Sequence, residues 1–176
     1  MIWADDILIL SETEKGLQDK LDNLRVYCKK NKLEVNTDKT KAMTFTKSGR
    51  LLQRDFYFGR TKLENVREYK YLGFIVTPSG EIHTGLKDLR VRAMRALAKI
   101  RKALGPLFQQ NIWNTKHLYD CMVKPILLYN SDFWGSLKHP KNSPVECVHL
   151  SFHRQLLGVR KQTNTDAVHL ELNSTP

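Results

Sequence analysis

Met1-Ile2-Trp3-Ala4-Asp5-Asp6-Ile7-Leu8-Ile9-Leu10-Ser11 is the stretch of this 176-residue chain that decides the fold. Two adjacent acids, Asp5 and Asp6, stand between a short apolar segment and the run 7–10, which predicts a strand, a tight acidic turn and a second strand. Successive side chains of a strand point to opposite faces, so both acids reach one ligand only where the backbone turns. Carboxylates displayed in this way suit Mg²⁺, which binds one or two carboxylates together with substrate phosphates.

An Asp-Asp pair taken alone is more often ordinary turn chemistry. Aspartate accepts hydrogen bonds from its own backbone and tolerates the conformations of turns. The rest of the chain therefore has to decide between a structural turn and a metal site.

Composition favours a nucleic-acid partner. Lys and Arg outnumber Asp and Glu by 29 to 18, an excess that attracts polyanions, nucleic acid first and anionic membrane second. No apolar run approaches the roughly 20 residues that span a bilayer, and no signal peptide is recognisable at the N-terminus, so we expect an intracellular protein. Cys28, Cys121 and Cys147 are odd in number and widely spaced, which fits free thiols of a reducing compartment better than disulfides.

The first half of the chain predicts one helix and several short strands. Ser11 and Glu14 form a candidate capping box for a helix through Asn31, whose inward face would carry Leu17, Leu21, Leu24 and Cys28. Short strands at Leu33 to Val35 and Ala42 to Phe45 would flank the polar turn 36–41. Residues 56–63 predict a hairpin, and a strand segment over 69–77 ends at the turn Pro78-Ser79-Gly80.

Beyond Pro78 the periodicity becomes helical. A long helix would bury Leu86, Leu89, Ala93, Leu97, Ile100 and Leu104 and carry Arg92, Arg95, Lys99 and Lys102 on its opposite face. Such a cationic face suits the phosphates of a duplex, although a charged helix face is usually only solvated. A second helix over 115–129, with a kink or a break at Pro125, would bury Leu118, Met122, Ile126 and Tyr129. A third helix is predicted over 145–157, and the tail 159–176 fits a further helix or a frayed end.

Cys147, His149 and His153 have a spacing with some likeness to a metal site. The two histidines lie one helical turn apart, as zinc ligands on a helix do. No fourth ligand with finger-like spacing lies nearby, which favours a mixed helix face over zinc.

Four motifs in a fixed order resemble the reverse-transcriptase domain of non-LTR (LINE-type, jockey-like) retrotransposons. They are Ala4-Asp5-Asp6, Asn36-x-x-Lys39-Thr40, Tyr71-Leu72-Gly73 and Leu127-Leu128-Tyr129. Trp3 stands where the family usually has Tyr or Phe, and Asn130 and Asp132 replace a Gly and a Glu of the last motif. The resemblance implies an α+β fold. A partial polymerase palm with a small antiparallel sheet, one packed helix and a primer-grip-like hairpin would occupy 1–83, thumb-like helices 84–137, and a helical extension 138–176.

The resemblance also implies roles for individual residues. Asp5 would be a direct ligand of Mg²⁺ or Mn²⁺ and Asp6 would support it, in a site that holds two metal ions about 4 Å apart in the parent enzymes. Lys39 would lie near the triphosphate and protonate the leaving pyrophosphate. Tyr71, Leu72 and Gly73 would form the primer grip. The partners implied are an RNA template, an RNA–DNA or DNA duplex and dNTP.

Polymerase chemistry in this family also needs an Asp and fingers that precede the acidic box. We therefore expect the isolated chain to be inactive, as a fragment of an RNA-directed DNA polymerase. Two other hypotheses stay open: a non-catalytic basic module that binds duplex or structured RNA, and the product of a decayed mobile-element reading frame.

Overall fold

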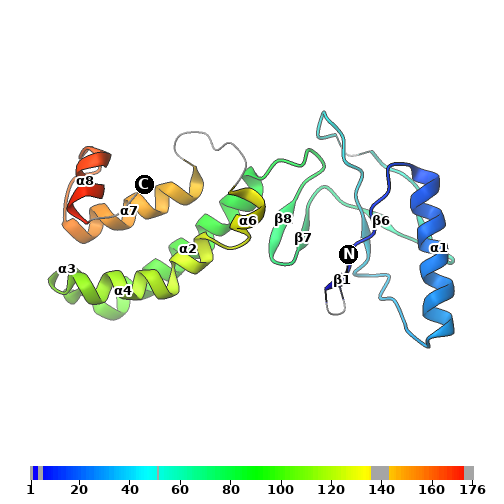
Figure 1. Ribbon diagram of the computed structural model, residues 1–176, viewed down its shortest axis with the longest axis horizontal. Helices are drawn as coiled ribbons and strands as arrows, with labels where there is room; N and C mark the ends of the chain where they lie inside the picture. Colours follow the sequence, from blue (N-terminus) through cyan, green and yellow to red (C-terminus); the bar gives the residue numbers. More distant parts are fainter. Residues whose placement is uncertain (1, 4–5, 51, 136–142, 173–176) are drawn as a thin grey trace. The chain divides into compact units, whose positions relative to one another are not determined.

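The computed structural model describes residues 2–3, 6–50, 52–135 and 143–172 (Figure 1). The chain divides into two compact units. The first, called the N-terminal unit here, comprises Met1–Lys70 and Val76–Glu81, and the second, called the helical unit, comprises Tyr71–Ile75 and Ile82–Pro176. The chain is thus a mixture of helices and small sheets, in agreement with the α+β class, whereas its division into palm, thumb and extension stays a prediction.

Strands in the described residues are short and pair two by two. Antiparallel pairs join β1 (Ile2–Trp3) to β2 (Asp6–Ile7) and β4 (Tyr57–Phe58) to β5 (Thr61–Lys62), and β7 (Tyr69–Tyr71) pairs with β8 (Phe74–Val76). β3 (Lys41–Ala42) pairs in parallel with β6 (Glu64–Asn65). The last pairing joins segments more than 20 residues apart, so no local turn signal announces it.

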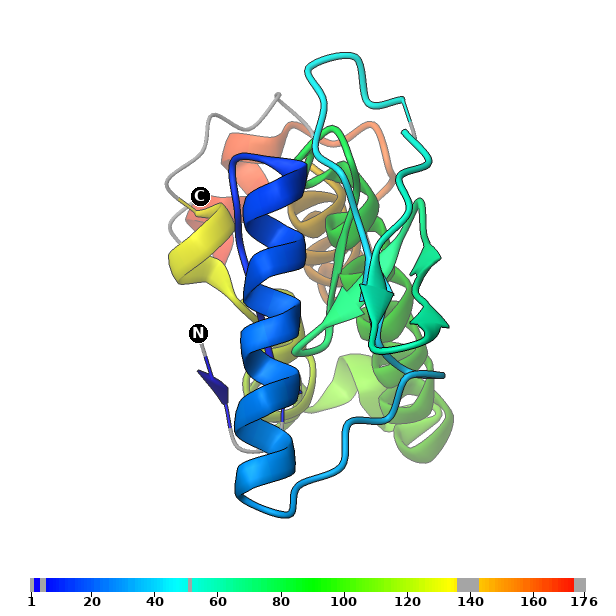
Figure 2. The ribbon, with the colours of Figure 1, turned by 90° about the vertical axis from the view of Figure 1, so that its right-hand side faces the viewer.

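Helix α1 (Glu14–Lys30) is the single helix described in the N-terminal unit and is drawn in blue in Figure 2. Its N-cap is Thr13, whose hydroxyl accepts a hydrogen bond from the Gly16 backbone at 3.1 Å. The capping box predicted at Ser11 and Glu14 is therefore wrong. The helix begins after Thr13, and Gly16, three residues after this N-cap, donates the capping hydrogen bond. The predicted inward face is confirmed at Leu21 and Cys28, both 6% exposed.

The core of the N-terminal unit consists of Leu21, Ala42, Phe56 and Leu63. Gln18 joins α1 to β4, because its side-chain amide donates to the Tyr57 carbonyl at 2.9 Å and accepts from the Tyr57 N–H at 3.0 Å. The strands predicted around Leu33 and Phe45 are absent at those residues, and each of these side chains is 55% exposed. Their alternating pattern was misleading because the core is filled from α1 and from residues 42–63 instead.

In the helical unit, the longest helix described is α2 (His83–Leu104), which ends at Gly105 with φ 52°. The helices after it are α3 (Leu107–Gln110), α4 (Ile112–Met122), α5 (Lys124–Leu127), α6 (Ser131–Trp134), α7 (Pro144–Leu157) and α8 (Thr165–Glu171). The predicted inward face of α2 is confirmed from Leu86 to Ile100. Of the tail 159–176, for which a helix and a frayed end were both predicted, Thr165–Glu171 forms α8.

The core of the helical unit gathers side chains from α2, α3, α4, α5 and α7. Tyr119 and Phe152 stack in it with ring centroids 3.8 Å apart. The face predicted for the second helix is wrong by one residue, because Thr115, Tyr119, Val123 and Leu127 are buried while Met122 and Tyr129 are 47% and 40% exposed. The helix is interrupted at Val123, between α4 and α5, and not at Pro125. This interruption shifts the phase of the apolar pattern.

Helix α7 confirms the third helix predicted over 145–157 and begins one residue earlier, at Pro144. The Ser143 hydroxyl accepts from the Glu146 N–H at 3.2 Å, Pro144 occupies the first turn, and Gly158 closes the helix with φ 66°.

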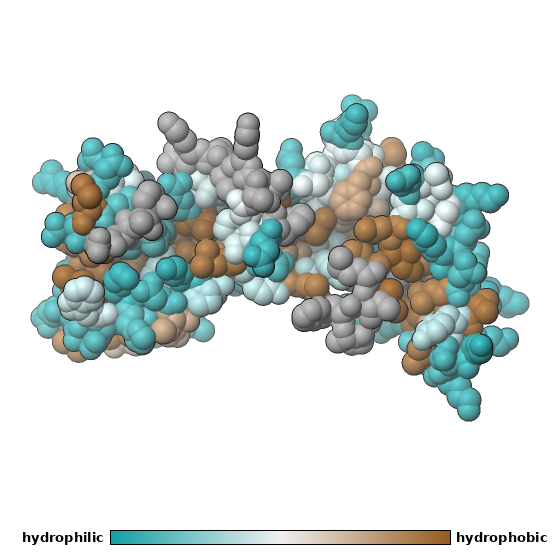
Figure 3. Space-filling view, viewed as in Figure 1, coloured by the Kyte–Doolittle hydropathy of each residue, from teal (hydrophilic) through white to brown (hydrophobic). Residues whose placement is uncertain are grey.

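Hydrophobic residues, brown in Figure 3, also remain on the visible surface, next to hydrophilic ones. Within the described ranges, each helix is too short or too polar to cross a bilayer.

Replacing Leu97 by Ala should destabilise the helical unit. Leu97 lies on α2, is 3% exposed and belongs to the core, so truncation leaves a cavity and should lower the free energy of unfolding by about 2–5 kcal/mol. Met94→Ala is the matched control, because Met94 lies on the same helix and is 39% exposed. Denaturant unfolding followed by circular dichroism measures both. Equal losses for the two variants would contradict the packing described.

Candidate nucleic-acid and metal site

The second acid of the opening stretch, Asp6, lies in a pair of antiparallel strands. Trp3 pairs with Asp6 and Ile2 with Ile7. Asp6 is exposed at the start of β2. Asp5, the predicted direct metal ligand, lies outside the described residues. Two antiparallel strands are therefore confirmed, although the second is Asp6–Ile7 and not the predicted run 7–10, and the predicted acidic turn falls outside the described residues.

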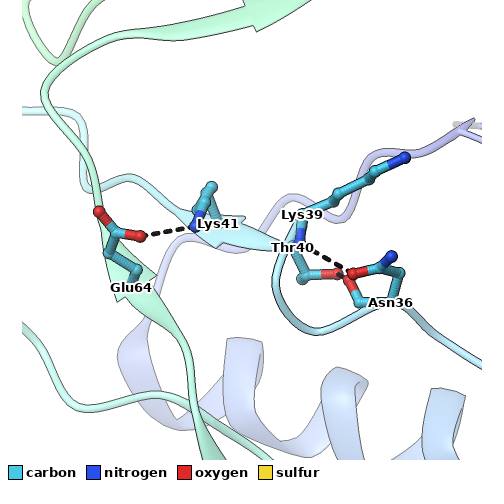
Figure 4. Close-up of polar contacts among 5 residues, drawn as sticks. All are labelled: Asn36, Lys39, Thr40, Lys41 and Glu64. Carbon is cyan, nitrogen blue, oxygen red and sulfur yellow. Dashed lines mark hydrogen bonds and ion pairs between the residues drawn. The ribbon is translucent and has the colours of Figure 1, made fainter.

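Lys39 lies in a turn that Asn36 organises (Figure 4). The Asn36 side-chain oxygen accepts from the Lys39 backbone N–H at 3.1 Å, and the Asn36 carbonyl accepts from the Thr40 hydroxyl at 2.8 Å. The Lys39 side chain extends away from these bonds and is exposed (Figure 4). Lys41, two residues later, forms an ion pair with Glu64 at 2.5 Å. Lys41 is thus held within the fold by an ion pair, whereas the Lys39 ammonium is exposed to solvent.

Tyr71 ends β7, and Leu72 and Gly73 form the turn of the β7–β8 hairpin. Leu72 and Gly73 have φ of 45° and 79°, and two consecutive positive φ values are typical of a tight two-residue hairpin turn. The Gly73 carbonyl accepts a hydrogen bond from Arg92 on α2 at 2.9 Å. The Leu72 carbonyl accepts from the Tyr129 hydroxyl at 2.5 Å. Both backbone carbonyls of the turn are therefore held by side chains of the helical unit.

Phe74, the residue after the turn, packs directly against α2. It is 4% exposed, and a Cβ built on Gly85 would overlap its ring. A Cβ on Gly73 would lie 3.2 Å from the Tyr129 ring, so the close approach that Gly73 permits is to a side chain of the fold. Two glycines thus seat the hairpin turn on the helical unit.

The predicted cationic face of α2 has three exposed cations and one that is partly buried. Arg95, Lys99 and Lys102 are exposed. The Arg92 side chain is only 31% exposed, forms an ion pair with Asp88 at 3.0 Å, and lies 5.9 Å from the centre of the Tyr129 ring. Because its guanidinium also holds the Gly73 carbonyl, Arg92 supports the hairpin turn and differs in environment from the other three cations.

The sequence missed Tyr129, Asp88 and Gly85 as members of this arrangement. Tyr129 belonged to a recognised motif, but the motif gave no partner for it. The signal for Asp88 and Arg92 was their spacing of four residues, which places them side by side on a helix. Nothing local in the sequence indicated that Gly85 faces Phe74.

The donor chemistry of the acidic hairpin fits a hard divalent cation in part. Carboxylate oxygens are suitable ligands, and Asp6 is accessible. Among the described residues no third carboxylate groups with Asp6 into a metal-binding cluster. Asp6 is therefore accessible as an oxygen ligand, and the metal site at Asp5 and Asp6 stays a prediction.

Part of the chain matches the model of a known protein family. Residues 1–76 match the model of the family described as reverse transcriptase (RNA-dependent DNA polymerase). No solved structure matches the chain. The match ends at Val76, the last residue of β8, so it covers Asp5 and Asp6, the Lys39 turn and residues 71–73.

Three similar proteins come from mobile elements. A transposon-derived protein of Caenorhabditis elegans is 28% identical over 89% of this chain and 56% of its own length. The RNA-directed DNA polymerase from mobile element jockey of Drosophila funebris is 24% identical over 97% of this chain and 19% of its own length. An RNA-directed DNA polymerase attributed to transposon BS of Drosophila melanogaster is 28% identical over 76% of this chain and 16% of its own length. The chain thus spans only part of the curated relatives that it matches.

Gly85→Ala tests the seating of the hairpin. Alanine is the better helix former by about 1 kcal/mol, so helix propensity alone predicts stabilisation. The clash with Phe74 predicts instead a net loss of about 1–3 kcal/mol, measured by denaturant unfolding.

Two further variants control this prediction. Ala98→Gly, at an exposed position of α2, measures how much the difference in helix propensity between Ala and Gly alone changes the free energy of unfolding. Phe74→Leu combined with Gly85→Ala should recover part of the loss. A Gly85→Ala variant more stable than the unaltered chain would show that Phe74 does not pack there.

Proposed function

We propose that the chain takes part in RNA-directed DNA synthesis as a segment of a polymerase of a mobile element, since residues 1–76 match the reverse transcriptase family model and similar proteins include polymerases of mobile elements. The family match carries this proposal. The partners proposed are an RNA template, an RNA–DNA or DNA duplex and dNTP. The parts of the chain would act as a partial palm over 1–83, a thumb over 84–137 and an extension over 138–176.

Asp5 and Asp6 would hold the divalent cation, Mg²⁺ or Mn²⁺. The exposure of Asp6 and its place at the start of β2 support this assignment. When bound, the cation would activate the primer 3′-hydroxyl and stabilise charge on the leaving pyrophosphate. In this proposal the two carboxylates would bind and orient the cation.

Lys39 would offset negative charge on the leaving group. An ammonium close to the triphosphate lowers the energy of the charge that develops there and can donate a proton. The Asn36 turn supports this role, because it fixes the backbone at Lys39 while the ammonium stays exposed.

Arg95, Lys99 and Lys102 would contact the phosphates of the primer–template duplex, and Tyr71, Leu72 and Gly73 would lie against the primer strand. Three exposed cations on one side of a long helix suit a regular polyanion without reading its sequence. Arg92 would act by positioning, because it holds the Gly73 carbonyl. A turn held at two carbonyls keeps its shape when a strand lies against it.

Replacing Arg95, Lys99 and Lys102 together by Ala should weaken binding to an RNA–DNA duplex. Removing one cation that touches a phosphate should reduce the slope of log affinity against log salt concentration by about 1. Fluorescence anisotropy at several salt concentrations measures the slope. The matched control replaces three exposed cations outside α2, Lys15, Lys29 and Lys47, and removes the same charge.

A control triple variant that binds as weakly as the α2 variant would show that net charge, and not this helix, binds the duplex. A salt-independent affinity of the unaltered chain would reject duplex binding through phosphates altogether.

Mn²⁺ should broaden the backbone NMR signals of residues 5–7 when an RNA–DNA duplex and dNTP are present. The paramagnetic ion relaxes nuclei close to its ligands, and the effect should disappear in Asp5→Asn/Asp6→Asn. Asp19→Asn/Asp22→Asn, on the exposed face of α1, is the matched control and should leave the broadening unchanged. Broadening centred on α1 instead would contradict the assignment.

A further inference from the structure

Three histidines that the proposed polymerase role does not use come together in the helical unit. His149 and His153 lie one helical turn apart on α7, and His169 lies on α8. One ring nitrogen of each can serve as a ligand atom, and these three atoms all lie within 4.8 Å of one another. From this arrangement we propose that the three imidazoles form a zinc-binding site that joins α8 to α7.

The spacing of the rings is close to that of a zinc centre. A tetrahedral site with Zn–N bonds of 2.0–2.1 Å separates its ligand nitrogens by about 3.4 Å. The ring centroids of His149 and His153 are 4.1 Å apart, and that of His169 lies 6.1 Å and 5.9 Å from them. Small rotations of the rings would bring the three nitrogens to one ion, with the fourth position left to water or another ligand.

Burial keeps two of the imidazoles in the form that binds metal. His153 is 1% exposed, and burial, followed by repulsion from His149, lowers its pKa to about 3. Burial also lowers the pKa of His149, with repulsion from His169 as the second cause. Both rings are therefore neutral near neutral pH, and the neutral imidazole has the lone pair that a metal needs.

Tyr119 provides a supporting contact to one of the three histidines. Its hydroxyl oxygen lies 3.0 Å from Nδ1 of His149, and its ring is fixed by the stack on Phe152. When Nδ1 carries the proton, His149 donates to the Tyr119 oxygen and keeps Nε2 for the metal. Burial raises the pKa of the Tyr119 hydroxyl, which therefore stays protonated.

The charges around the cluster limit its affinity. Lys116 and Lys124 oppose a dication at this place, whereas Asp120 favours it. Lys116 and Asp120 form an ion pair at 3.0 Å, which offsets part of the repulsion. We therefore expect zinc binding weaker than that of a site with thiolate ligands.

The ligand type distinguishes this site from the acidic hairpin. Imidazole nitrogen suits Zn²⁺, whereas Mg²⁺ requires oxygen ligands. The sequence had favoured a mixed helix face because no further ligand followed Cys147, His149 and His153 at finger-like spacing. The structure supplies the third histidine from α8, and the cluster is formed without Cys147. A bound ion would also stabilise α8, a helix of only seven residues that is marginal by itself.

Isothermal titration of the metal-free full chain with Zn²⁺, and visible spectroscopy with Co²⁺ in its place, test the proposal. One ion per chain should bind, with the intense absorption of tetrahedral cobalt, and zinc should raise the midpoint of thermal unfolding. His149→Gln and His169→Gln should each weaken binding by about 100-fold. Tyr119→Phe keeps the ring stack and should weaken binding by about 10-fold, as the loss of a group that orients a ligand does.

His117→Gln is the matched control. His117 is exposed on α4 and lies 3.7 Å from the Cys121 sulfur, so it represents adventitious surface binding, and its loss should leave the affinity unchanged. Circular dichroism checks that each variant is folded. If His169→Gln unfolds α8, the His149→Gln variant still tests the site, because His149 is only half-buried. Failure of the unaltered chain to bind zinc, or binding that survives His149→Gln and His169→Gln, would show that the histidines are only packed side chains.

Discussion

The burial of one face of α2 is the constraint on which the helical unit depends. Leu89 and Ala93 are fully buried, Leu97 and Ile100 are nearly so, and α4, α5 and α7 all contact this helix. Burying an apolar face fixes the rotation of a helix about its own axis. The same packing therefore decides that Arg95, Lys99 and Lys102 face solvent and that Arg92 stands at the border, where it reaches the Gly73 carbonyl.

The β7–β8 turn shows how a short motif acquires a fixed shape. Its residues make contacts with three parts of the helical unit: Phe74 with Gly85, the Gly73 carbonyl with Arg92, and the Leu72 carbonyl with Tyr129. Two residues of the turn have positive φ, a conformation that costs free energy unless the surroundings hold it. The hydrogen bonds from Arg92 and Tyr129 supply that support. Residues of two motifs far apart in the sequence therefore form one structural arrangement.

The two candidate metal sites differ in the way the chain builds them. The predicted acidic site is local, because its two carboxylates are neighbours in the sequence, and it lies within the segment that matches the reverse transcriptase family model. The histidine cluster needs α7 and α8 to pack against each other, and it lies beyond that segment. Oxygen ligands in the first and nitrogen ligands in the second select different cations, so the two sites would not compete for the same ion.

The sequence by itself determined the α+β class, the inward faces of α1 and α2, the position of α7 and the likeness to reverse transcriptases, because each rests on residues that are near in sequence or on an ordered set of motifs. It misplaced the cap of α1, the strands near Leu33 and Phe45 and the inward face of α4. Those features depend on competition between neighbouring segments for one core. Only the tertiary structure decided that Arg92 holds a turn, that Gly85 admits Phe74 and that His169 joins His149 and His153. Each of these is a contact between residues distant in sequence, and local periodicity carries no information about which distant side chain fills a given space.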